Sequence, residues 1–169
     1  LVNELPPIVI TPSSTDVLCF GATDGTATVD VDGGTGTGTY TYLWSPGNGT
    51  TATVIGLASG TYTCDVTDQS GCTITSPSVA VGNATPLTWT LSTTDVDCHG
   101  NTSGEATVTA SGGTGFNTYS YLWTPTNQIT ATATGLGAGN YTCVITDGNG
   151  CQINTGNIEI HQPLAPLSV

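Results

Sequence analysis

The chain alternates short stretches of apolar and polar positions with turns rich in Gly, Asp, Asn and Pro. Between residues 25 and 31, for example, Ala27, Val29 and Val31 alternate with Thr and Asp. A period of two places successive side chains on opposite faces of a β-strand. In the first half of the chain, the pattern predicts strands at about 7–11, 15–19, 25–31, 39–45, 50–57, 61–67 and 72–81.

Turn signals such as Asp32-Gly33-Gly34 and Pro46-Gly47-Asn48-Gly49 separate these stretches. Many short strands divided by such turns are typical of a β-sandwich. We therefore expect an all-β fold. In the first half, the side chains expected to face the interior are Ala27, Val29, Val31, Tyr40, Tyr42, Trp44, Tyr62, Cys64, Val66, Cys72 and Ile74.

A shift of 79 residues aligns the chain with itself without a gap. Comparison of positions 7–85 with 86–164 gives 38 identities in 79, and all three cysteines of the first half meet a cysteine in the second. Self-similarity of this kind indicates a tandem duplication. We expect two sandwiches in series, at 1–83 and 84–169.

The two ends of the chain fall out of phase with these domains. The strand that begins at Pro7 aligns with the one that begins at Pro86, and the final residues from Pro166 start a third copy of it. We expect a two-repeat window of a longer series, with 1–11 and 160–169 as linkers or terminal strands. The residues expected to join neighbouring copies are Pro7, Ile8, Val9, Ile10, Ile158, Ile160, Leu167 and Val169, with Leu43 and Leu122 as lateral contacts.

Composition narrows the choice of partner and compartment. The chain has 35 Thr and 23 Gly among 169 residues, which favours strands over helices. It has 12 Asp and Glu but no Lys or Arg. Nucleic acid and anionic lipid surfaces are therefore poor partners, because the chain has no Lys or Arg side chain to neutralise their phosphates. No apolar run reaches the roughly 20 residues of a membrane span. Six Cys without a Cys-x-x-Cys pair suggest disulfides and an extracellular location.

Three cysteines in each repeat cannot all pair internally. We expect the flanking residues to bond, Cys19 with Cys72 and Cys98 with Cys151, because both lie in loops that close the sandwich. Cys64 and Cys143 would then be buried thiols. The alternative joins Cys19 to Cys64 and leaves Cys72 free or linking subunits.

Several motifs, in a fixed order, resemble the SprB-type repeat. They are Cys19-Phe20-Gly21 with Asp24-Gly25, Gly33-Gly34-Thr35 before Tyr40-x-Tyr42-x-Trp44, Gly56-Leu57 with Gly60-x-Tyr62, and Val66-Thr67-Asp68-x-x-Gly71-Cys72. That family forms long arrays of immunoglobulin-like modules in bacterial cell-surface adhesins, including a gliding-motility adhesin. The resemblance implies extension and adhesion without catalysis.

Of four smaller features, the first has one structural interpretation and the other three have two each. Tyr62 and Tyr141 resemble the tyrosine corner of immunoglobulin-like sandwiches. Trp44 and Trp123 could stack on sugars, but core packing is favoured. Acidic residues that recur in both copies could bind calcium or simply form turns, and they are Asp16, Asp68, Asp95 and Asp147. Four Asn-x-Ser/Thr triplets are glycan acceptors or chance matches, at Asn48, Asn83, Asn101 and Asn140.

Catalysis has little support in the sequence. The two histidines, His99 and His161, lack counterparts in the first repeat, and no nucleophile elbow, zinc motif or phosphate loop is present. We expect no enzyme activity and no cofactor. The sequence favours a structural repeat of an extracellular filament or adhesin stalk, which is either assembled head to tail with its own copies through terminal strands or continued covalently. The alternative is a module that binds glycans or a protein at a bacterial surface.

Overall fold

The computed structural model of the chain describes residues 7–35, 38–115 and 118–164. The chain divides into two compact units, Leu1–Ala84 and Thr85–Val169, and each folds around a hydrophobic core of its own. Every regular element in the described residues is a β-strand, so the expected all-β class is confirmed. Among these residues, no helix is long and apolar enough to span a membrane.

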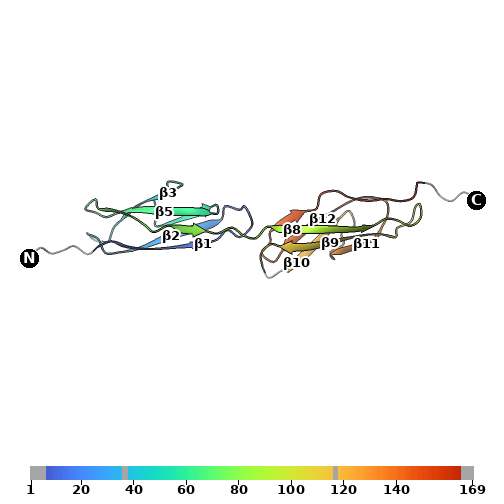
Figure 1. Ribbon diagram of the computed structural model, residues 1–169, viewed down its shortest axis with the longest axis horizontal. Coiled ribbons are helices and arrows are strands. Elements are labelled where there is room, and N and C mark those ends of the chain that lie inside the picture. Colours follow the sequence, from blue (N-terminus) through green and yellow to red (C-terminus); the bar gives the residue numbers. More distant parts are fainter. Residues whose placement is uncertain (1–6, 36–37, 116–117, 165–169) are drawn as a thin grey trace, which may run out of the picture. The chain divides into compact units, whose positions relative to one another are not determined.

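The first unit is a sandwich of two antiparallel sheets (Figure 1). Its strands are β1 (Val9–Thr15), β2 (Gly25–Asp32), β3 (Thr41–Ser45), β4 (Thr53–Leu57), β5 (Gly60–Thr67), β6 (Thr73–Thr75) and β7 (Val79–Val81). One sheet has the order β1-β2-β4 and the other β3-β5-β6, with β7 pairing with the first part of β5.

The second unit repeats this arrangement strand for strand. Its strands are β8 (Leu87–Thr94), β9 (Gly104–Gly112), β10 (Tyr119–Thr124), β11 (Thr132–Leu136), β12 (Gly139–Asp147), β13 (Gln152–Asn154) and β14 (Ile158–Ile160). The sheets have the orders β8-β9-β11 and β10-β12-β13, and β14 pairs with the first part of β12.

This topology is immunoglobulin-like. In immunoglobulin domains, strands A, B and E share one sheet and strands C, F and G share the other. Here β1, β2 and β4 match A, B and E, while β3, β5 and the β6–β7 pair match C, F and G. Tyr62 completes the comparison, because its hydroxyl donates to the carbonyl oxygen of Ala58 at 2.9 Å and so forms a tyrosine corner at the start of β5. Tyr141 makes the same bond to Gly137 at 3.0 Å.

The abundance of Thr follows from the outer faces of the sheets. Pairs of Thr stand opposite one another on adjacent strands, and their hydroxyl groups hydrogen-bond. Thr28 and Thr53 lie 2.9 Å apart across β2 and β4, and their equivalents Thr107 and Thr132 also lie 2.9 Å apart. These pairs stabilise the strands on faces where an apolar residue would be exposed.

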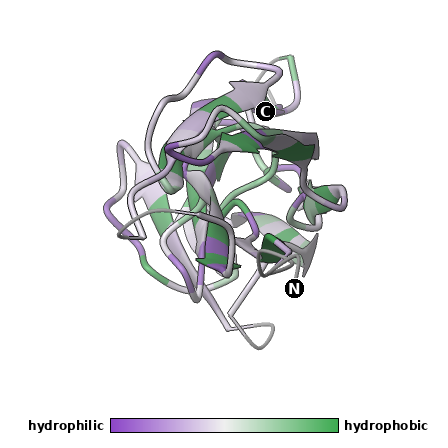
Figure 2. Ribbon diagram, turned by 90° about the vertical axis from the view of Figure 1, so that its left-hand side faces the viewer, coloured by the Kyte–Doolittle hydropathy of each residue, from purple (hydrophilic) through white to green (hydrophobic). Residues whose placement is uncertain are grey.

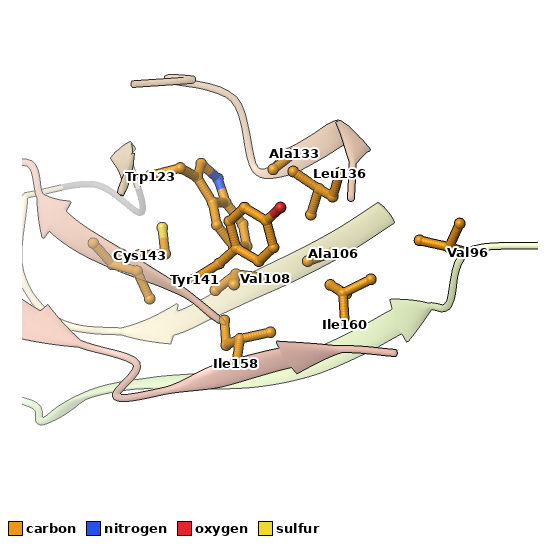
Figure 3. Packing of buried hydrophobic residues seen from close by; sticks show 11 residues of the cluster. Val96, Ala106, Val108, Trp123, Ala133, Leu136, Tyr141, Cys143, Ile158 and Ile160 are labelled. Atoms are coloured by element: carbon orange, nitrogen blue, oxygen red, sulfur yellow. The ribbon is translucent and has the colours of Figure 1, made fainter. Parts of the chain in front are cut away.

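The core of each unit lies between its two sheets. Trp44 on β3 is paired with Cys64 on the neighbouring strand β5, and both side chains are almost completely buried. Trp123 and Cys143 form the same pair in the second unit, where Figure 3 shows the tryptophan beside the ring of Tyr141. Each indole N–H donates to a backbone carbonyl, at 2.8 Å for Trp44 and 2.9 Å for Trp123, so burial leaves no polar group unpaired on either ring. The green and pale bands along the strands in Figure 2 show the same alternation of apolar and polar positions.

Two predictions about strands were wrong. The segment 15–19 is not a strand, because β1 continues to Thr15 and the chain then turns. The segment 72–81 is interrupted at Ser76-Pro77-Ser78, and the second unit has the same break at Thr155-Gly156-Asn157 without a proline. Ser76 turns inward instead, and its hydroxyl accepts the Cys64 N–H at 2.9 Å.

Two residues expected in the core are on the surface for the same reason. Cys72 is exposed, and Ile74 is 41% exposed. The strand they were assigned to is reduced to β6, three residues long and exposed throughout. Val79 and Val81 on β7 close the core in their place.

Candidate functional site: the two ends of each sandwich

The chain enters each sandwich at one end, which we name the upstream end. In the first unit it contains Ile8, the Gly33–Gly34 turn and Asp68. Strand β1 begins here, since Val9 pairs with Asp32. Gly33 has a φ of +81°, and a Cβ atom on it would overlap the carbonyl oxygen of Pro7. Glycine therefore allows the turn to lie directly against the incoming chain.

Asp68 ties the upstream end together although it is only 6% exposed. Its Oδ2 accepts from the N–H and the hydroxyl of Thr35 at 3.1 and 2.7 Å. Its Oδ1 accepts from the N–H groups of Ser70 and Cys72, both at 2.9 Å, and from the Ser70 hydroxyl at 2.7 Å. The hydroxyls of Thr35 and Ser70, together with the N–H donors, hold the pKa of Asp68 well below its ordinary value.

Asp147 holds the same place in the second unit. It accepts from the N–H of Thr114 at 2.7 Å, of Asn149 at 3.0 Å and of Cys151 at 2.8 Å. Burial opposes ionisation of this carboxyl, but the three N–H donors and the Thr114 hydroxyl outweigh it, so the pKa of Asp147 is lowered. Both carboxylates therefore act as fixed acceptors for the turns around them.

The lowered pKa of Asp68 predicts a loss of stability in acid. A carboxyl that is more acidic folded than unfolded contributes stability above its unfolded pKa, about 3.9, and loses that contribution as the pH falls through the folded value. We expect Asp68→Asn to lower the melting temperature at pH 7, and the gap from the parent chain to narrow between about pH 4 and pH 2. Thermal unfolding followed by circular dichroism across this range measures the effect.

Asp30→Asn is the matched control, because Asp30 is an exposed residue of β2. It should leave both the melting temperature and its pH profile near those of the parent. An Asp68→Asn profile parallel to the parent's at every pH would contradict the assigned role of the carboxylate.

The chain leaves each sandwich at the opposite, downstream end. Here the backbone N–H of Val17 donates to the carbonyl of Gly82 at 3.2 Å, and Asp16 accepts the Gly82 N–H through Oδ1 at 2.6 Å. Asn83 follows, and its Oδ1 accepts from the N–H of Gly21 at 3.1 Å. The departing chain is thus bound to the loop that joins β1 and β2.

The second unit holds its departing chain in the same way. Asp95 accepts the N–H of His161 at 2.9 Å, and the carbonyl of His161 accepts from Val96 at 2.9 Å. Gln162 then accepts from the N–H of Gly100 at 2.9 Å. The recurrence of Asp16 as Asp95 therefore has a structural reason, which the sequence showed only as a repeated acidic position.

The calcium candidates are not brought together. Asp16 and Asp68 lie at opposite ends of the first unit, and Asp95 and Asp147 are separated in the same way in the second. Each accepts backbone N–H groups instead. Across 7–35, 38–115 and 118–164, no three His, Cys, Asp or Glu side chains gather into a group that could hold a metal ion.

The expected Cys19–Cys72 and Cys98–Cys151 bridges are not formed. Cys72 and Cys98 are exposed free thiols. Cys19 lies in the downstream loop after Thr15, whereas Cys72 lies at the upstream end, so the length of β1, about 20 Å, separates them. A disulfide requires Cα atoms within about 7 Å. The sequence placed both cysteines in loops but did not show that the loops close opposite ends.

Cys64 and Cys143 are buried free thiols inside the two cores. In antibody domains the cysteine at this place on strand F bonds to a cysteine on strand B. Strands β2 and β9 contain no cysteine, so the thiols pack as small apolar groups. Burial raises the pKa of both thiols, which keeps them unreactive.

Most residues expected to join neighbouring copies belong to their own sandwich. Ile8 is buried, and Val9 and Ile10 pair with Asp32 and Val31 of β2. Ile158 and Ile160 are buried on β14. Exchange of these strands between copies would therefore remove core residues from the donor, and the structure does not support that mode of assembly. Pro7 is exposed, and Leu167 and Val169 lie outside the described residues.

Other predicted surface residues are accessible. Leu43 and Leu122 are 49% and 48% exposed on the outer faces of β3 and β10. The four asparagines of the glycan triplets are also exposed, at Asn48, Asn83, Asn101 and Asn140. Lateral contact and glycosylation remain predictions.

The comparisons with known proteins agree with the repeat. The SprB repeat family matches residues 11–49 and again residues 90–128, at the same place in each unit. The chain carries two tandem SprB repeats. No curated protein matches its sequence.

Among the solved structures that resemble this chain is one of low sequence identity. It comprises the three N-terminal domains of the bacteriophage RB49 Highly Immunogenic Outer Capsid protein (Hoc), with 19% identity and a TM-score of 0.43. The match covers 92% of this chain and 59% of that one. SprB repeats occur in cell-surface proteins.

Proposed function

We propose that the chain is a structural repeat unit of an extracellular filament or adhesin stalk, strung end to end with copies of itself on a cell surface. The observation that carries the proposal is that the chain enters each sandwich at one end and leaves it at the other. In the first unit, Val9 starts β1 upstream, and Gly82 departs beside Asp16 downstream. A module threaded in this way adds its length to a string without folding back.

The same threading suits a part that bears load. A pull on the two ends of a unit acts along β1 and β7, parallel to the strands. Ladder hydrogen bonds run perpendicular to antiparallel strands, so the pull shears all seven residue pairs of β1 and β2 together. The clamp of Asp16 on Gly82 and the contact of Gly33 with Pro7 fix the two points where the load enters.

The proposal includes no catalytic step and no cofactor. The polar side chains that recur at both ends are committed to backbone hydrogen bonds, and the indoles that could stack on a sugar are buried. The partners we propose are copies of the chain, joined end to end rather than by exchange of β1 or β14.

Electron microscopy of the full chain tests the function. We expect fibres one molecule wide at high protein concentration, with an axial repeat set by two sandwiches. A chain shortened by residues 165–169 is the control for the contribution of the C-terminal segment. A chain that stays monomeric at every concentration, yet binds glycans on an array, would overturn the proposal in favour of a binding module.

Assembly should increase with ionic strength. Each copy carries a net charge of −12 with no Lys or Arg, so copies repel one another and cannot form Lys or Arg ion pairs across a joint. Screening shortens the range of this repulsion from about 30 Å at 0.01 M salt to about 8 Å at 0.15 M. Light scattering during a sodium chloride titration should show fibres lengthening. Fibres that fall apart as salt is added would contradict this account.

A further inference from the structure

We propose that Cys98 of one copy forms a disulfide with Cys72 of the next copy, which makes the joints of the filament covalent. The inference rests on the proposed end-to-end assembly. It adds that the joint between copies contains a Cys98–Cys72 bond, which forms only when an oxidant is present.

The first observation is that these two cysteines can reach another molecule. The structure has four free cysteines among its described residues, and two of them, Cys64 and Cys143, are buried. Cys72 and Cys98 are exposed. Serine or alanine is the common choice for a surface position that needs only a small residue, whereas an exposed thiol in an oxidising compartment is readily oxidised.

The second observation is their place in the fold. Cys72 lies at the upstream end of the first unit, where its N–H bonds to Asp68 at 2.9 Å. Cys98 lies at the downstream end of the second unit, between Val96 and Gly100, whose N–H groups both donate to the departing chain. In a string of copies, the downstream end of one second unit meets the upstream end of the next first unit. The two exposed thiols are therefore at the two ends that meet.

The surroundings of Cys72 suit such a contact. It lines a hollow of about 220 Å³ together with apolar residues of the upstream end, namely Pro7, Ile8 and Ile74. Ile74 is 41% exposed, so it presents apolar surface to a partner at this hollow. A partner loop seated here would bury apolar surface and bring its own thiol towards Cys72. Such an apolar contact does not depend on Lys or Arg ion pairs, which these two acidic copies cannot form.

The bond needs an oxidant, which we assign to the class of small disulfides and thiol–disulfide oxidoreductases. The Cys98 thiolate attacks the disulfide of the oxidant, forms a mixed disulfide and releases one thiol. The Cys72 thiolate of the next copy then attacks the Cys98 sulfur and releases the second thiol. Two protein thiols are oxidised to one disulfide, the oxidant is reduced to two thiols, and the two protons from the cysteines end on the released thiols.

Oxidised glutathione provides the test with the full chain. After incubation at fibre-forming concentration, a non-reducing denaturing gel should show a ladder of covalent multimers that disappears with reductant. Cys72→Ser and Cys98→Ser should each remove every species above a dimer. Both substitutions are at exposed positions, so circular dichroism melting should remain unchanged and exclude misfolding as the cause.

Mixing the two variants identifies the direction of the joint. Cys72→Ser retains Cys98, and Cys98→Ser retains Cys72, so an equimolar mixture should form a covalent dimer at least ten-fold faster than either variant alone. Peptic digestion and mass spectrometry should find the Cys72 peptide joined to the Cys98 peptide. Equal rates for the mixture and the separate variants, or Cys72–Cys72 and Cys98–Cys98 peptides only, would overturn the inference.

A Cys72→Ser/Cys98→Ser double variant separates this inference from the proposed function. If the double variant forms fibres and the parent chain forms no covalent ladder, the filament proposal is supported and the disulfide proposal is contradicted. If the parent chain forms no fibres under any condition, both the filament and the disulfide proposals are contradicted. Fibres from both proteins, covalent only in the parent, are the expected result.

Discussion

Replacement of Trp123 by alanine should unfold most of the second unit. The indole lies between the sheets, almost completely buried, opposite Cys143 and beside Tyr141 (Figure 3). Truncation of a buried tryptophan to alanine costs about 3–5 kcal/mol, because apolar burial is lost and a cavity remains. The change also leaves the carbonyl of Thr130 without the indole N–H. A sandwich of this size has little stability to spare.

Leu122→Ala is the matched control, since Leu122 is the adjacent residue of β10 and is 48% exposed. It should cost less than about 1 kcal/mol. Amide hydrogen exchange, resolved by mass spectrometry into peptides of the two units, should show Trp123→Ala losing protection across residues 86–164 and retaining it across 7–81. Equal protection of β12 in the two variants would show that the tryptophan is not the centre of this core.

The sequence predicted the fold well because the period-two pattern and the duplication are strong, local signals. The alternation in 25–31 and 61–67 became β2 and β5 with the expected inward residues, and the Tyr62 corner followed from its spacing to Cys64. Prediction failed where the alternating stretch forms only a short edge strand, β6. Cys72 and Ile74 alternate correctly, yet β6 is too short and too exposed to bury them.

The joints were harder to predict than the strands because a sequence does not show which loops share an end. Cys19 and Cys72 both follow strands, and nothing local distinguishes a bridge between them from two cysteines on opposite ends. Register decides it: Val9 pairs with Asp32, and Thr15 pairs with Thr26, so the loop after β1 lies a full strand away from the turn at Asp68. The same register places Asp16 just beyond β1 at the downstream end, where its carboxylate accepts the Gly82 N–H of the departing chain.

Substitution of alanine for Gly33 should displace the incoming chain and destabilise the first unit. The residue has a φ of +81°, where an L-residue costs roughly 1–2 kcal/mol. Its new Cβ would also overlap the Pro7 carbonyl oxygen, a backbone atom that cannot rotate away. Overpacking of this kind adds about 1–3 kcal/mol. We expect a total loss of about 2–5 kcal/mol in the free energy of unfolding, measured by denaturant titration.

Gly21→Ala isolates the contribution of the backbone dihedral angle. Gly21 has a similar φ of +73°, but a Cβ there meets no atom within 4 Å. Its cost should stay at about 1–2 kcal/mol, and the difference between the two variants measures the contact between the turn and the chain at Pro7. That contact is at the end where a preceding copy would be joined. Gly33→Ala should therefore also shorten fibres at a protein concentration where the Gly21→Ala chain assembles normally, and equal fibre lengths would show that the upstream end tolerates a displaced chain.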